Sequence, residues 1–310
     1  MSRAEMLMRI DGLRSGRTPF VLATVVRAER PTSAKPGDCA LVLADGTIDG
    51  FVGGVCAEST VRLESLRLLQ AGESGLLRIT PRADVEDEPE QEGVRTVGNP
   101  CLSGGTLEIF LEAMIPPALV SVYGEAPVAR ALVRVGHALD WDVRASVDPA
   151  APIAPDTSAV VAASHGRDEA TVLRAALESG VPYVALLASR RRAAGVRDDL
   201  AAMGVEADQR DRVHAPAGLD IGARTAPEIA LSVFADIIAH RPRVNLDGAR
   251  GAAESGQFAT ASPEIAKDPV CGMDVAVTAA SISAQHAGDT AYFCGTGCRQ
   301  AFLDDPQRFR

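Results

Sequence analysis

The sequence predicts an α/β protein built from three parts: an N-terminal mixed α+β domain, a Rossmann-like doubly wound parallel sheet, and a small C-terminal domain. The 310 residues are too many for one ordinary core. Strand and helix patterns alternate through the middle of the chain, which is typical of a parallel sheet. All six cysteines lie toward the two ends. We therefore expect domains over 1–116, 117–240 and 267–310, joined by a Gly-, Ala-, Ser- and Pro-rich linker over 241–266.

The composition narrows the class of protein. Hydrophobic residues make up 46% of the chain and aromatic residues only 4%, which fits an α/β protein rich in Ala, Val, Leu and Gly. The N-terminus lacks a signal-peptide core, and no apolar run approaches the ~20 residues of a membrane helix. We expect a cytoplasmic protein without stable membrane insertion, in which disulfides are the less favoured use of thiols. The net charge of −10 argues against nucleic-acid binding.

In the first domain, strand-like segments at 20–27 and 39–43 are followed by a hairpin turn signal at 44–47. The segment 58–70 then has helical periodicity. Cys56 is therefore expected at or just before a helix N-terminus, where the macrodipole and free N–H groups lower a thiol pKa and favour anions. The alternative is a small buried cysteine in a tight turn.

Two of the three N-terminal cysteines lie beside glycine pairs. Cys56 follows Gly53-Gly54, and Cys101 precedes Gly104-Gly105. Backbone without side chains lets a ligand approach a thiol closely, so this repetition favours a functional role for both. Cys39 lies in an apolar strand and is expected in the core.

The middle domain has four predicted strands, at 119–123, 142–147, 159–163 and 183–187. A glycine turn follows the first strand, but the second and third glycines of the dinucleotide-binding fingerprint are replaced by Ala126 and Ala129. Asp148 follows the second strand, about where such folds place their ribose-binding acid. The pattern indicates the Rossmann-like fold and gives little support to NAD binding.

Two loops of this domain are candidate ligand sites. The segment 189–192 carries three arginines after a strand, where such sheets bind ligands; a solvated helix start is the alternative for Arg191 and Arg192. The apolar, Gly/Pro-rich segment 213–223 leads into a helix opened by Thr225-Ala226-Pro227-Glu228. His214 within it is either a ligand-contacting group or a satisfied structural histidine.

Three motifs resemble the xanthine dehydrogenase accessory family, XdhC/CoxI, over about residues 14–239. They are Gly53-Gly54-Val55-Cys56-Ala57-Glu58, Tyr183-Val184-Ala185-Leu186-Leu187-Ala188-Ser189-Arg190-Arg191-Arg192, and Val213-His214-Ala215-Pro216-Ala217-Gly218-Leu219-Asp220-Ile221-Gly222. Members of that family bind molybdenum cofactor, promote its sulfuration and pass it to xanthine dehydrogenase or carbon monoxide dehydrogenase type enzymes. The resemblance implies a maturation factor, a cofactor chaperone rather than a catalyst, with a client molybdenum hydroxylase as partner. A cysteine desulfurase and a second copy of the chain are further candidate partners.

The resemblance also implies that the molybdenum cofactor (molybdopterin) lies in a cleft between these two domains. The thiophilic molybdenum or its sulfur would meet Cys56 and Cys101, and the cofactor's phosphate would meet backbone N–H groups and Arg190 at the carboxyl edge of the sheet. The expected cofactor-binding residues are Cys56, Cys101, Gly53, Gly54, Glu58, Gly124, Ser189, Arg190, His214 and Asp220.

The tail from 267 onward has about 44 residues, a size that often needs a metal or another staple to fold. Its cysteines fall in Lys267-Asp268-Pro269-Val270-Cys271-Gly272-Met273 and Ala291-Tyr292-Phe293-Cys294-Gly295-Thr296-Gly297-Cys298, and with the segment 302–309 these resemble a YHS domain. Cys271, Cys294 and Cys298 suit zinc or copper(I). His286 is the candidate fourth ligand, with an exposed loop histidine as the alternative. We expect a metal-stapled domain that melts independently of the rest on chelation.

Two functions of other classes stay open. A NAD-dependent oxidoreductase needs a usable glycine turn and a hydride-transfer site, and neither is visible in the sequence. A metal-binding sensor or delivery protein would act through the YHS-like tail. Metal analysis and pterin fluorescence would distinguish these functions from a cofactor chaperone.

Overall fold

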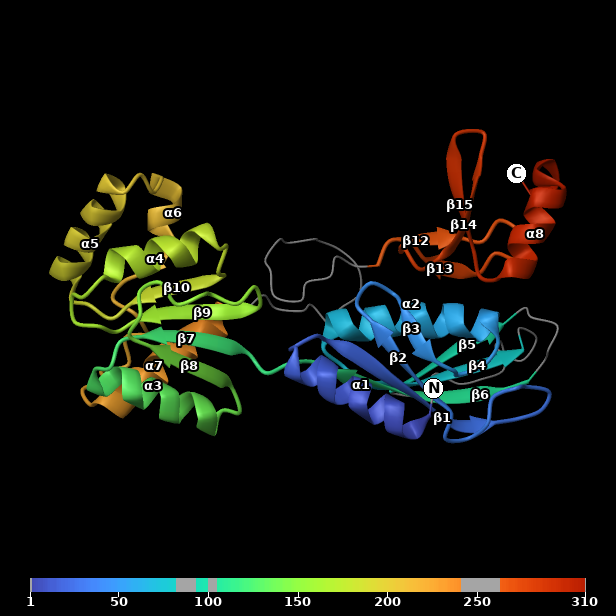
Figure 1. Ribbon diagram of the computed structural model, residues 1–310, viewed down its shortest axis with the longest axis horizontal. Coiled ribbons are helices and arrows are strands. Elements are labelled where there is room, and N and C mark those ends of the chain that lie inside the picture. The colour runs from blue at the N-terminus through green and yellow to red at the C-terminus, as the bar shows by residue number, and fades with distance from the viewer. Residues whose placement is uncertain (1, 82–92, 100–104, 241–262, 310) are drawn as a thin grey trace. The chain divides into compact units, whose positions relative to one another are not determined.

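The computed structural model describes residues 2–81, 93–99, 105–240 and 263–309 (Figure 1). The chain forms two compact units. Unit 1 joins Met1–Pro116 with Phe258–Arg310, and unit 2 is Pro117–Gln257. Among the described residues, no helix is both long and apolar enough to cross a membrane.

Unit 1 is built on a six-stranded sheet that is antiparallel except for its last pair. In spatial order the strands are β3 (Ile48–Gly50), β2 (Cys39–Leu43), β1 (Phe20–Ala28), β6 (Leu107–Met114), β4 (Gly75–Pro81) and β5 (Val94–Asn99). The helices α1 (Arg3–Ser15) and α2 (Val55–Ala71) pack against it. The predicted strands at 20–27 and 39–43 and the hairpin turn after them are confirmed, and the predicted helix begins earlier than expected, at Val55.

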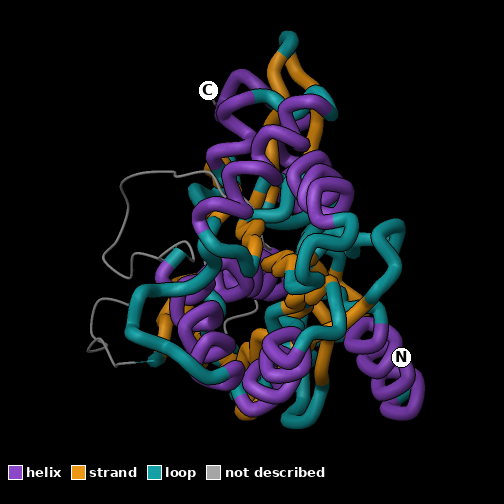
Figure 2. Tube along the Cα trace, turned by 90° about the vertical axis from the view of Figure 1, so that its left-hand side faces the viewer, coloured by secondary structure: helices purple, strands orange, loops and turns teal. Residues whose placement is uncertain are grey.

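The tail forms two small antiparallel pairs and a short helix (Figures 1 and 2). These elements are β12 (Ile265–Lys267), β13 (Asp274–Ala276), β14 (Ile282–His286), β15 (Asp289–Phe293), α8 (Thr296–Asp304) and the 3-10 helix η2 (Pro306–Phe309). Its own core is small and is centred on Ala284, Phe293 and Phe302. A core of this size supplies little stability by itself.

The helix α2 is buried on two faces. One face, with Ala57 and Val61, packs into the core of the six-stranded sheet. The other face presents Leu63 and Leu66, which form a separate apolar cluster with Ala276 of β13. Fully removing a leucine side chain from water is worth about 1.5–3 kcal/mol, so this contact favours a docked tail.

The docked tail differs from the independent domain that the sequence suggested. The β2–β3 turn also meets it, because a Cβ atom on Gly46 would lie 2.8 Å from the hydroxyl oxygen of Thr278. A glycine is therefore required for this close approach. The segment that the sequence assigned to the linker also ends earlier than expected, since β12 begins at Ile265.

Unit 2 is a five-stranded parallel sheet with helices on both faces (Figure 1), which confirms the predicted Rossmann-like fold. In spatial order the strands are β11 (Val213–His214), β10 (Tyr183–Leu186), β9 (Thr157–Ala162), β7 (Leu119–Tyr123) and β8 (Asp142–Ser146). One face is covered by α3 (Pro127–Ala138) and α7 (Ala226–Ala239), and the other by α4 (Glu169–Glu178) and α5 (Arg190–Ala202). A short helix, α6 (Ala207–Asp211), precedes β11.

Gly124 lies where β7 turns toward α3 and the backbone passes close to the end of β9. Its φ is +120°, and a Cβ atom there would lie 2.4 Å from the carbonyl oxygen of Ala163. Both the positive φ and the close approach exclude other residues without distortion. Gly124 therefore has a structural reason to be glycine that is independent of any ligand.

We predict that Gly124→Ala lowers the free energy of unfolding of unit 2 by about 2–4 kcal/mol, through backbone strain and a clash with Ala163. The measurement is denaturant unfolding followed by the fluorescence of Trp141, the chain's single tryptophan, which packs edge-on against Phe234. The control is Gly195→Ala in α5, where a Cβ atom meets nothing within 4 Å. That variant should gain up to about 1 kcal/mol in helix propensity. Equal losses in the two variants would contradict the explanation.

Candidate functional site

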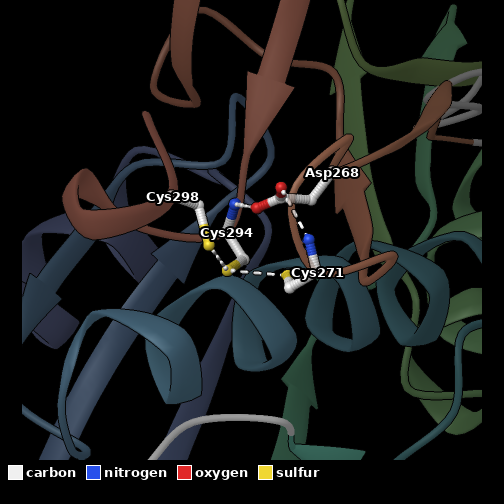
Figure 3. Close-up of side chains that lie close together, drawn as sticks. All are labelled: Asp268, Cys271, Cys294 and Cys298. Carbon is white, nitrogen blue, oxygen red and sulfur yellow. Dashed lines mark hydrogen bonds between the residues drawn. The ribbon is translucent and has the colours of Figure 1, made fainter. Parts of the chain in front are cut away.

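Three thiols and a carboxylate of the tail meet in one cluster (Figure 3). Cys271 follows β12, Cys294 follows β15, and Cys298 lies in the first turn of α8. The Sγ atom of Cys294 lies 3.6 Å from that of Cys271 and 3.7 Å from that of Cys298. One ligand atom from each of these cysteines and from Asp268 lies within 4.8 Å of all the others.

These distances match a tetrahedral thiolate site. A Zn–S bond of about 2.3 Å gives a ligand–ligand edge of about 3.8 Å, which is 1.63 times the bond length. All three cysteines are in the reduced form. The residues therefore fit a thiophilic ion such as zinc or copper(I), as the sequence predicted from their spacing.

Asp268 organises the cluster through hydrogen bonds to backbone. Its Oδ1 atom accepts from the N–H groups of Val270 at 2.8 Å and Cys271 at 3.4 Å, and its Oδ2 atom accepts from the N–H group of Cys294 at 2.8 Å. The residue is only 1% exposed. Burial opposes ionisation of this carboxyl, but the N–H groups of Cys294 and Val270 outweigh it and hold its pKa below the ordinary value. Asp268 thus joins the loop that carries Cys271 to the end of β15.

The thiols of the cluster differ in pKa because of their shared hydrogen bonds and their burial. A hydrogen bond from Cys294 lowers the pKa of Cys271 to about 7. Cys294 keeps its proton in these bonds, first with Cys271 and then with Cys56, and its pKa is raised. Burial raises the pKa of Cys298 to about 12. Cys271 is therefore the thiol that ionises first.

Cys56 lies beside this tail cluster. It is the second residue of α2, half-buried, and it packs against the apolar group formed by Met273, Val275 and Cys294. Its thiol shares a hydrogen bond with Cys294, and a Cβ atom on Gly295 would lie 3.8 Å from its Sγ atom. The sequence predicted Cys56 in the cofactor site and the tail cysteines in a metal site of a different domain, whereas the structure brings Cys56 and the tail thiols together.

The other predicted residues of the N-terminal thiol site lie around the start of α2. Gly54 is its N-cap, Gly53 precedes it with a φ of +139°, and Glu58 lies in its first turn. Cys101 lies outside the described residues. Cys39 is partly buried in a small core beside α1, as predicted.

His286 does not join the cluster, which corrects its assignment as the fourth ligand. Its ring packs edge-on against Phe302, with the ring centroids 5.6 Å apart. The residue ends β14, whereas the thiols gather at the end of β15 and the start of α8. No spacing pattern marks Asp268 in the sequence, because its contribution depends on hydrogen bonds from backbone N–H groups. One of these groups belongs to Cys294, which is 26 positions away.

The arginines at the start of α5 have different surroundings. Ser189 is the N-cap of α5 and accepts from the N–H group of Arg192. The Nη1 atom of Arg192 lies 2.7 Å from both carboxylate oxygens of Glu169, which is 3% exposed. Arg192 is therefore a structural arginine that holds α5 to the 164–169 turn. Arg190 is exposed and borders a shallow depression beside Ala215 and Pro216.

His214 lies on the α7 side of the sheet. Its ring stacks on that of Tyr183 at 4.3 Å, and its Nδ1 atom lies 4.0 Å from Oδ2 of Asp236. The hydroxyl of Tyr183 donates to that carboxylate at 2.6 Å, and His240 lies 3.1 Å from its other oxygen. Burial, and then the neighbouring His240, lower the pKa of His214. These contacts are those of a structural histidine, and Asp220 is exposed in the loop that follows.

The fold and the site define a class of protein: a thiol-bearing α+β unit with a docked cysteine cluster, joined to a Rossmann-like unit. A family model described as the XdhC and CoxI family matches residues 13–80, and one described as the XdhC Rossmann domain matches residues 120–237. The chain belongs to the XdhC and CoxI family.

Curated relatives come from Escherichia coli (strain K12). The chain is 30% identical over 253 residues to "Uncharacterized protein YqeB", covering 73% of this chain but only 44% of YqeB. It is 22% identical over 282 residues to "Molybdenum cofactor insertion chaperone PaoD", covering 77% of this chain and 88% of PaoD. A crystal structure titled as a xanthine dehydrogenase from Bacillus halodurans matches 80% of this chain and 98% of its own, with 18% identity and a TM-score of 0.36.

We predict that Asp268→Asn destabilises the docked tail by about 1.5–3 kcal/mol. In the variant, the amide NH₂ replaces one carboxylate oxygen, so two donors face each other and a backbone N–H group loses its acceptor. Tyr292 is the single tyrosine of unit 1, since the other two are Tyr123 and Tyr183 of unit 2. With fluorotyrosine incorporated, the native ¹⁹F signal of Tyr292 should disappear at a lower denaturant concentration in the variant than in wild type. The unfolding midpoints reported by Tyr123 and Tyr183 should be unchanged.

The matched control for this prediction is Asp274→Asn. Asp274 pairs with Lys267 at 2.6 Å, but Lys267 is largely exposed and Asp274 is partly exposed, so the loss should be within about 1 kcal/mol. A midpoint for Asp268→Asn that is no lower than that of the control would contradict the role of the buried carboxylate.

We predict that unit 2 loses stability on acidification through His214. Its folded pKa lies below the ordinary 6.5, so the unfolded chain takes up the proton first. Its contribution to stability is present above about pH 6.5 and is lost as the pH falls through the lowered pKa. Unfolding followed by Trp141 fluorescence at about pH 7.5 and 5.5 should show a smaller pH dependence for His214→Gln than for wild type. The exposed His137 supplies the control, and His137→Gln should keep the wild-type dependence.

Proposed function

We propose that this chain is an accessory factor that binds molybdenum cofactor and assists its insertion into a molybdoenzyme of the xanthine dehydrogenase or carbon monoxide dehydrogenase type. Membership of the XdhC and CoxI family and the likeness to PaoD support the proposal. Sulfuration of the cofactor, with a cysteine desulfurase as the sulfur source, is the finer part of the proposal. Whether the chain acts as a homodimer stays a prediction.

The observation that carries the proposal is the position of Cys56. It lies in the first turn of α2, inside the segment that matches the family, and its N-cap Gly54 has no side chain to satisfy the N–H groups of that turn. Such a helix start favours an anionic ligand and a thiolate. When bound, the molybdenum would supply the thiophilic centre, and Cys56 would hold it or shield its terminal sulfur. Cys101 is proposed to assist and awaits the same test.

The second part of the proposed cofactor site is the start of α5. Arg190 is exposed there, and Ser189 caps the helix. Within the described parts of the chain, no buried carboxylate engages the guanidinium of Arg190, unlike that of Arg192, and such a guanidinium suits the cofactor's phosphate. The shared cleft between Cys56 and this edge of the sheet stays a prediction.

The two alternative functions have unequal support. The NAD-dependent oxidoreductase has less support, because Ala126 and Ala129 occupy two glycine positions of the dinucleotide-binding fingerprint. The glycine at position 124 is explained by its close approach to Ala163. A metal-binding sensor or delivery protein is favoured by one specific observation, the thiol cluster of the tail. Nothing prevents such a cluster from serving a cofactor chaperone as well.

We predict that Cys56→Ser lowers the amount of cofactor that the protein retains several-fold, because a hydroxyl of similar size is a poor ligand for a soft metal. The protein is produced in a host that makes molybdopterin and purified without oxygen, and bound pterin is measured by the fluorescence of its oxidised form. Cys39→Ser, in the partly buried core position beside α1, is the control. Retention unchanged in Cys56→Ser, or equally reduced in both variants, would count against the role of Cys56.

A further inference from the structure

Four thiols of unit 1 come together although they lie far apart in the sequence. Cys271, Cys294 and Cys298 form the tail cluster, and Cys56 packs against it from the first turn of α2 and shares a hydrogen bond with Cys294. Cys56 is not one of the residues whose ligand atoms lie within 4.8 Å of each other. Its sulfur lies beside that group, half-buried in the first turn of α2. A change of its side-chain rotamer would bring the sulfur to an ion bound by the tail thiols.

We propose that Cys56, Cys271, Cys294 and Cys298 form one four-thiolate site for a tetrahedral divalent ion of the zinc type, and that this ion locks the tail onto α2. Three ligands come from the tail and one from the N-terminal domain. Binding converts each thiol to a thiolate and releases its proton.

The choice of Cys56 over Asp268 as the fourth ligand rests on hydrogen bonding. Asp268 accepts three backbone N–H groups, which engage both of its oxygens, and it is 1% exposed. Coordination by this carboxylate would weaken the bonds that place Cys271 and Cys294. A fourth sulfur leaves them intact, and four cysteines are a common ligand set of structural zinc. Asp268 is therefore a positioning residue.

The helices around the site favour the charge that four thiolates bring. Cys56 lies in the first turn of α2 and Cys298 in the first turn of α8, so two helix N-termini converge on the sulfur atoms. Both helices have a glycine N-cap, Gly54 and Gly295, and neither N-cap makes a side-chain hydrogen bond. Four thiolates around a divalent ion leave a net charge of about −2, and the positive ends of two macrodipoles offset part of it.

A bound ion would also affect cofactor binding by Cys56. This consequence rests on the proposed function, whereas the four-thiolate site does not. A sulfur bound to a zinc-type ion cannot also hold molybdenum. Ion occupancy would then cover Cys56, and release of the ion would expose it. The tail would act as a metal-dependent cap on the chaperone thiol.

The test uses full-length protein, reduced, metal-free and anaerobic, titrated with Co²⁺ as a spectroscopic substitute for Zn²⁺. Wild type should bind one ion with intense thiolate-to-cobalt charge transfer. Cys56→Ser should lose about a quarter of that intensity, since three thiolates remain of four, and should bind Zn²⁺ at least about tenfold more weakly. The control Cys39→Ser should keep the full intensity per bound ion.

A second measurement on wild type does not depend on how any variant folds. The alkylation rate of each thiol is followed by mass spectrometry with and without Zn²⁺. The ion should slow alkylation of Cys56 at least about tenfold, together with the tail thiols, and leave Cys39 unchanged. A wild-type protein that binds no Co²⁺, full intensity in Cys56→Ser, or a Cys56 that Zn²⁺ does not protect would each overturn the proposal. None of these outcomes depends on cofactor retention, so failure here is distinguishable from failure of the proposed function.

Discussion

The burial of the second face of α2 is the constraint on which the arrangement of unit 1 depends. A helix on the surface of a sheet normally exposes one side, but α2 carries leucines on both. The tail covers the outer side through Ala276, and the β2–β3 turn accepts it at Gly46. Without this contact, α2 would expose Leu63 and Leu66 to solvent, and the tail would keep a core of only a few residues. Docking buries these leucines and enlarges the apolar contact of the tail at the same time.

That contact also decides the surroundings of the thiols. Because β13 lies along α2, the cysteine cluster at the ends of the tail's strands meets the first turn of the helix, where Cys56 lies. Asp268 sets the spacing within the cluster by joining two backbone segments with one carboxylate. In unit 2 a similar division holds: Glu169 holds Arg192, while Arg190 beside it is exposed. In both units a buried carboxylate holds a backbone segment or an arginine in place beside a less buried side chain, Cys56 in unit 1 and Arg190 in unit 2.

Much of the architecture follows from sequence patterns, and the failures have physical causes. Short apolar runs and the alternation of strand and helix patterns located β1, β2 and the parallel strands of unit 2. Strands that are buried on both faces, such as β2 and β9, leave continuous apolar segments in the sequence. The spacing of Cys271, Cys294 and Cys298 predicted that these three thiols lie together, and they do. The docking of the tail was missed, although Val61, Leu63 and Leu66 together made α2 apolar around much of its surface. Asp268 was missed because hydrogen bonds to backbone have no sequence period, and His286 was chosen by residue type alone although its ring packs on Phe302.

Unit 1 is formed by two segments that are separated in the chain, so its N-terminal segment is synthesised well before its tail. Cys56 and Cys271 are 215 positions apart, the difference of their numbers, and the whole of unit 2 is synthesised between them. At the ribosome's pace of about 5–20 residues per second, roughly 10–40 s separate the emergence of the two thiols. During that interval α2 can settle on its sheet while its outer face has no tail to cover it. The nascent chain therefore passes through a stage in which no tail packs against Cys56, and that contact forms only after residues 263–309 have been made.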